Sequence, residues 1–72
     1  MADVLAEMVA NVWQVLAEVG QSVAEGDEIL VLESMKMEIP VVAPVTGTLT
    51  ELRVANGDVV QEGDVLAVVT PA

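Results

Sequence analysis

Lys36 is the side chain with the clearest chemical potential in this sequence. It is the only lysine, and it lies in the run ESMKME at residues 33–38. Its ε-amine is a nucleophile that can be acylated to form an amide. The only other basic residue is Arg53, against 12 acidic residues. A lysine that served only solubility would be expected to have others nearby.

The length and composition predict one domain, residues 1–72, with a single aliphatic core. Seventy-two residues lie near the lower limit for a chain that folds without disulfides or a metal. Hydrophobic residues make up 54% of the chain, yet Trp13 is the only aromatic residue. We expect Trp13 to be a partly buried packing residue.

Several classes of function are disfavoured by what the chain lacks. Without cysteine or histidine it has no thiolate nucleophile, no zinc-thiolate site and no base for a triad, so we predict neither catalytic residues nor a metal site. The net charge of -10 disfavours nucleic acid and membrane surfaces, and it favours a monomer. With no apolar run of about 20 residues and no basic leader, we expect a cytoplasmic protein.

The sequence contains an internal repeat. Residues 20–32 (GQSVAEGDEILVL) align with 57–69 (GDVVQEGDVLAVV) at a constant spacing of 37 residues, and the alignment continues upstream from Ala6 and Ala43. The halves therefore span about 6–32 and 43–69, and Lys36 lies in the segment that joins them. Each half carries G-x-x-V-x-x-G-D before an apolar run, a pattern typical of short strands and tight turns. We expect eight short strands.

One segment carries a conflicting signal. Residues 3–18 place apolar side chains at helical spacing, which alone would indicate an amphipathic helix. The equivalent segment, 44–55, contains a proline, a glycine and three threonines, which is poor helix material. Because duplicated halves share a fold, we predict strands in both.

The join between the halves is predicted to be a β-hairpin, residues 29–42, that breaks three local rules. Its two-residue loop, Met35-Lys36, needs positive φ without the usual glycine or asparagine. Glu33 faces Glu38 across the ladder, where like charges oppose pairing. Methionine is displayed at a solvent-facing tip. Such clustered violations mark functional or strained sites, so we interpret Lys36 as an anchor acylated by another protein, not merely a solvated charge.

These motifs resemble the biotinyl/lipoyl attachment domain family, and specifically its biotin carboxyl carrier branch. ESMKM at 33–37 is similar to that branch's E-A-M-K-M signature, and APVTG at 43–47 is similar to its A-P-x-x-G element. Both G-x-x-V-x-x-G-D frames also match. The resemblance covers almost the whole chain and implies an all-β fold. That fold is a flattened β-barrel (barrel-sandwich hybrid) of two four-stranded antiparallel sheets with quasi-twofold symmetry and the lysine on a hairpin tip.

The resemblance also implies a function. A biotin protein ligase would attach biotin to Lys36 through an amide. A biotin carboxylase would then load a carboxyl group, and a carboxyltransferase would pass it to an acyl-CoA or 2-oxo acid. This chain would be a non-catalytic carrier. The recognised surface around the lysine would comprise Glu33, Ser34, Met35, Met37 and Glu38.

The sequence departs from the family pattern at Ser34, which replaces alanine. No protruding thumb fits, because Gly20 and Gly26 are spaced as Gly57 and Gly63. The chain also lacks a proline- and alanine-rich linker, which indicates a small stand-alone biotinylated protein or an excised domain. Two alternatives stay open: a lipoyl-bearing domain of the same fold, and an unmodified barrel-sandwich binding module.

Overall fold

The computed structural model describes residues 1–72 as eight β-strands without a helix. No segment therefore forms a helix that could cross a bilayer. The strands are β1 (Ala2–Leu5), β2 (Ala10–Val15), β3 (Ser22–Val23), β4 (Glu28–Ser34), β5 (Met37–Val42), β6 (Gly47–Leu52), β7 (Val59–Val60) and β8 (Val65–Pro71).

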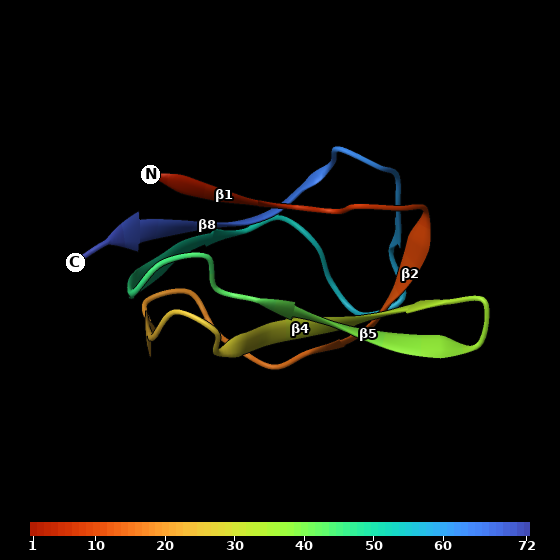
Figure 1. The fold of residues 1–72 in the computed structure, drawn as a ribbon, viewed down its shortest axis with the longest axis horizontal. Coiled ribbons are helices and arrows are strands. Elements are labelled where there is room, and N and C mark those ends of the chain that lie inside the picture. Colours follow the sequence, from red (N-terminus) through yellow and green to blue (C-terminus); the bar gives the residue numbers. More distant parts are fainter.

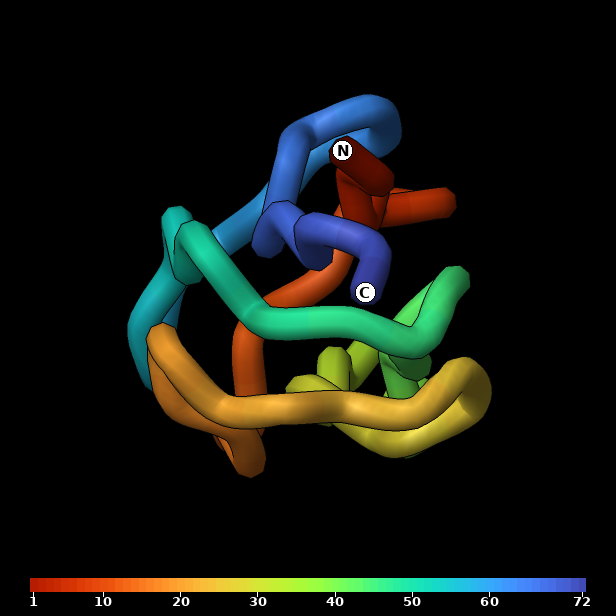
Figure 2. The backbone as a smooth tube through the Cα atoms, turned by 90° about the vertical axis from the view of Figure 1, so that its left-hand side faces the viewer, coloured from red at the N-terminus to blue at the C-terminus, as the bar shows by residue number.

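The strands form two four-stranded antiparallel sheets, as predicted. We call β1-β8-β6-β3 the terminal sheet, because it holds both ends of the chain, and β5-β4-β2-β7 the hairpin sheet. The molecule is elongated, with extents of 35 × 18 × 17 Å. Figure 1 shows the termini at one end of the long axis and the β4–β5 loop at the other. Seen end-on, the two halves wind around one interior (Figure 2).

The two sheets repeat each other. A shift of 37 residues carries β2, β3 and β4 onto β6, β7 and β8 with identical bounds, and it carries β1 into β5. The same shift converts the strand order of one sheet into that of the other. Bulges recur as well, between Val12 and Gln14 and between Leu49 and Glu51. The architecture therefore has the quasi-twofold symmetry expected from the sequence.

The segment with helical spacing forms β1 and β2, so the prediction of strands is confirmed. The bulge in β2 leaves Trp13 without a partner in β4 and places two consecutive residues outside the regular alternation. In β2, this irregular spacing departs from the strict alternation expected of a strand. Trp13 is 49% exposed, so it is only half-buried.

The Gly-Asp pairs close tight turns. Gly26 and Gly63 have φ values of +91° and +89°, a region that residues with a Cβ rarely adopt. Asp27 accepts the Ala24 N–H at Oδ2 (2.9 Å), and Asp64 does the same for Gln61 (2.8 Å). Each carboxylate thus stabilises its own turn, and the tight turns predicted at the Gly-Asp pairs are present.

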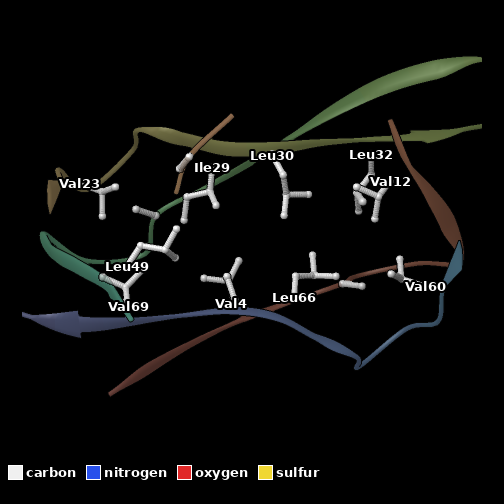
Figure 3. Packing of buried hydrophobic residues seen from close by; sticks show 14 of the residues in the cluster. Val4, Val12, Val23, Ile29, Leu30, Leu32, Leu49, Val60, Leu66 and Val69 are labelled. Carbon is white, nitrogen blue, oxygen red and sulfur yellow. The ribbon is translucent and has the colours of Figure 1, made fainter. Parts of the chain in front are cut away.

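The core lies between the two sheets and is wholly aliphatic. Ile29, Leu30, Leu49, Leu66 and Val69 are fully buried, and no polar side chain is buried. Figure 3 shows the labelled side chains of both sheets pointing into this shared space. Because both sheets pack against this one core, the base of the β4–β5 hairpin is held in place, and the loop projects from it.

Candidate functional site

The β4–β5 hairpin has the geometry predicted for its tip. Ser34 lies opposite Met37 and Glu33 opposite Glu38, so that only two residues form the loop. Those residues, Met35 and Lys36, have φ values of 53° and 63°. They are the only non-glycine residues of the chain with positive φ, and two successive such residues define a type I′ turn. The expected like-charge pair and strained loop are both present.

The hairpin tip is exposed to solvent. The side chain of Met35 is 91% exposed and that of Met37 is 65% exposed. The β4–β5 loop also lies at the far end of the molecule from both termini (Figure 1). Exposed methionines at a protruding tip have no role in the core, and their flexible thioether side chains are well suited to contact with other proteins.

The amine of Lys36 has no partner within the chain. The single ion pair of the structure joins Arg53 to Glu51, at 3.2 Å. No hydrogen bond involves the Lys36 side chain, and neither flanking glutamate holds it. The lysine is therefore not held in an ion pair, and its exposed amine is accessible to a reagent from solution.

Ser34 has a structural role that the sequence did not reveal. Its hydroxyl donates a hydrogen bond to the Val9 carbonyl, with an Oγ–O distance of 3.2 Å. In the other half, the equivalent carbonyl of Thr46 accepts the backbone N–H of Ala72 at 3.1 Å. Met35 is the counterpart of Ala72, but the chain reverses direction there, so no backbone N–H bonds the Val9 carbonyl in the same manner. The Ser34 hydroxyl donates to this carbonyl instead. The repeat spacing of 37 residues shows in the sequence that Val9 and Thr46 are equivalent positions.

The hairpin gathers the six predicted residues into one site. Side chains of a strand alternate between its faces, so Glu33 and Glu38 share one face while Ser34 and Met37 share the other. Lys36 projects beyond both faces at the turn. The arrangement presents one nucleophilic amine between an acidic face and a face with a methionine, on a scaffold with no buried catalytic group.

Comparison with known proteins identifies the family. The family model described as "Biotin-requiring enzyme" matches residues 1–69. The chain belongs to the biotin/lipoyl attachment family. The match includes both halves of the repeat and the hairpin between them.

Two relatives are similar in sequence over most of their length. The "Biotinylated protein TB7.3 homolog" of Mycobacterium leprae is 48% identical over 68 residues, which are 94% of this chain and 96% of the relative. The "Biotin/lipoyl attachment protein" of Bacillus subtilis is 47% identical over 60 residues, which are 83% of this chain and 82% of the relative. Both relatives are therefore close to this chain in size.

A solved structure shows the same fold within a much larger protein. The urea carboxylase of Kluyveromyces lactis matches 96% of this chain with a TM-score of 0.90 and 33% sequence identity. The chain corresponds to only 6% of that protein. These comparisons confirm the predicted fold and the predicted class, a biotin-bearing carrier.

Proposed function

We propose that Lys36 is the residue to which biotin is covalently attached, and that the chain carries carboxyl groups between enzymes. One observation supports this choice above others: the only lysine is unpaired, exposed and held on a strained two-residue turn. A backbone conformation that costs stability persists where function requires it. The hairpin fits biotin, since an accessible primary amine is the group that an amide bond to the biotin carboxylate needs.

Attachment is proposed to be the work of a biotin protein ligase. The Nζ atom of Lys36 attacks the carboxyl carbon of biotinyl-adenylate, forming an amide as the bond to the phosphate breaks and AMP departs. The ammonium form must first lose a proton, and no histidine or cysteine of this chain can accept it. In the proposed step, a base of the ligase takes this proton. Met35 and Met37 are the exposed apolar side chains beside the amine that the ligase can contact.

The partners of the loaded protein are proposed to be a biotin carboxylase and a carboxyltransferase. Bound biotin supplies the ring nitrogen that accepts and releases the carboxyl group. The chain itself fixes the position of the attachment point, because the buried residues Leu30 and Leu32 hold β4 in the core beneath the tip. A carrier visited by two enzymes must present its attachment point in a reproducible place.

Non-enzymatic character, a monomeric state and a cytoplasmic location are also part of the proposal. The chain has no histidine or cysteine that could act as a base or a thiolate nucleophile, and Asp27 and Asp64 are used in hydrogen bonds within their turns. The charge of -10 opposes association between copies. The absence of cysteine is compatible with a reducing compartment such as the cytoplasm.

A lipoyl group is the second candidate for Lys36, supported by similarity to a relative named a biotin/lipoyl attachment protein. The two methionines around the lysine favour biotin. To distinguish the two, the purified chain is incubated separately with a biotin protein ligase and a lipoate ligase, and its intact mass is measured. We expect one biotinyl group per chain. A lipoyl increment without a biotinyl increment would assign the other cofactor.

Carrier activity is tested with the biotinylated chain, a biotin carboxylase, ATP and radiolabelled bicarbonate. We expect label on the biotinylated chain and none on the unmodified chain. Biotinylation without labelling by any carboxylase of the source cell would support attachment but refute carboxyl transport.

A further inference from the structure

The structure contains one cavity, and it lies away from the hairpin tip. Its volume is about 570 Å³, and residues of β1, β5 and the turn before β8 line it. We call it the edge cleft, because β1 and β5 are the edge strands of their sheets.

Both walls of the edge cleft carry backbone groups that no strand pairs. β1 pairs only with β8, and β5 pairs only with β4, so each has one free edge. The two edges differ in one respect. Pro40 removes an amide N–H from the middle of β5, which weakens that edge as a template for another strand. β1 contains no proline, so each residue that turns its N–H and C=O away from β8 keeps both a donor and an acceptor.

The side chains of the edge cleft combine apolar and acidic groups. Leu5, Met8 and Val42 line it and are each exposed by 39–48%, so apolar surface is left uncovered around it. Asp3 and Glu62 add carboxylates. No basic side chain of this chain neutralises them, because Arg53 is bonded to Glu51 and Lys36 is on the tip.

We propose that the edge cleft is a docking groove for an extended, basic segment of a partner protein, which pairs as an additional strand with the free edge of β1. Alternate side chains of such a segment would face the apolar lining, and its lysine or arginine side chains would meet Asp3, Glu7 and Glu62. β1 is four residues long, so it would pair with about 13 Å of extended chain. A second copy of this acidic chain lacks the required charge.

The location of the groove would allow a partner to bind the chain without covering Lys36. Leu32 and Ile39 line it, and these two residues pair with each other two positions below Ser34 and Met37, the last pair before the loop. A segment bound there would contact the base of the hairpin and leave Lys36 free. The proposal does not depend on what Lys36 carries.

The repeat provides a matched control. Glu25 is the counterpart of Glu62 in the other half, in an equivalent turn, and it does not line the cleft. Glu62→Gln and Glu25→Gln therefore remove the same charge from equivalent backbone positions. Only the first removes it from the groove.

The test uses the full unmodified chain, labelled with 15N, and an acetylated, amidated hexapeptide of alternating lysine and valine. We expect saturable shifts of amide resonances in β1 and β5, with the Lys36 amide unaffected. Glu62→Gln should weaken binding by about twofold to fivefold, whereas Glu25→Gln should leave it unchanged. N-methylation of the alternate amides that face β1 should abolish binding, and N-methylation of the others should not.

Four results would overturn the proposal. Shifts spread over the whole acidic surface, or equal loss of affinity in both glutamine variants, would show general charge attraction. Equal binding by a glutamate-valine peptide would show that charge has no part. Concentration-dependent shifts of β1 and β5 without peptide would assign the groove to a second copy of the chain.

Discussion

Relief of backbone strain at the hairpin tip should stabilise the protein while removing its proposed function. The change is Met35→Asn together with Lys36→Gly, the residue types that type I′ turns prefer. Both native residues have positive φ, at 53° and 63°. Neither side chain contributes packing or a hydrogen bond, since Met35 is 91% exposed and Lys36 is unpaired.

The magnitude follows from the two backbone conformations. A left-handed residue with a Cβ costs roughly 1–2 kcal/mol, which asparagine reduces and glycine removes. The added freedom of glycine in the unfolded chain offsets about 0.5–1 kcal/mol of this gain. We expect a net increase of about 1–2 kcal/mol in the free energy of unfolding, which for a domain of this size raises Tm by roughly 4 °C or more.

Urea unfolding and thermal melts of the unmodified proteins, followed by circular dichroism, measure this effect. Met35→Ala with Lys36→Ala is the control, since it removes the same side chains but retains the unfavourable φ values. A stability of the asparagine-glycine variant equal to or below that of the alanine control would refute strain at the tip.

Three further predictions concern the scaffold. Gly47→Ala should destabilise the protein by about 2 kcal/mol or more, because an added Cβ would meet the Thr70 carbonyl oxygen. Urea unfolding measures this effect, and an unchanged midpoint would contradict the close approach. Ser34→Ala should cost roughly 0.5–1.5 kcal/mol and speed amide exchange at the hairpin base, whereas the control Ser22→Ala should do neither. Asp64→Ala should lower stability by about 1 kcal/mol, measured by urea unfolding, through loss of its turn hydrogen bond.

The long strands and the hairpin were predictable because the repeat supplied two independent views of one fold. Residues 44–55 could not form a helix, and this removed the ambiguity of residues 3–18. The loop was predictable for a similar reason. Two apolar strands separated by Met35 and Lys36 leave a two-residue turn as the simplest connection, whatever its strain.

Other features had no local signal. The bulge at Trp13 depends on how β2 aligns with β4, which is a property of pairing across the sheet. The hydrogen bond from Ser34 joins residues 25 positions apart, and a side chain that replaces alanine gives no hint of its acceptor. The edge cleft arises where the two sheets approach each other, so no single strand contains it.

The surface around the lysine was partly predictable. The exposure of Met35 and Met37 was predictable from the loop, because a two-residue turn projects from the sheet and leaves side chains in and beside it without neighbours to cover them. The absence of an ion pair did not follow. Glu33 and Glu38 are close in sequence to Lys36, and only the geometry shows that neither carboxylate lies within contact of its amine.

The most direct test of the central claim is the intact mass of the wild-type chain and of Lys36→Arg, each incubated with a biotin protein ligase, biotin and ATP. Circular dichroism first verifies that the variant is folded, as expected for an exposed turn residue. We predict one biotinyl group on the wild-type chain, located on Lys36 by peptide fragmentation, and none on Lys36→Arg. A folded Lys36→Arg protein that still gains one biotinyl group would contradict the assignment of Lys36.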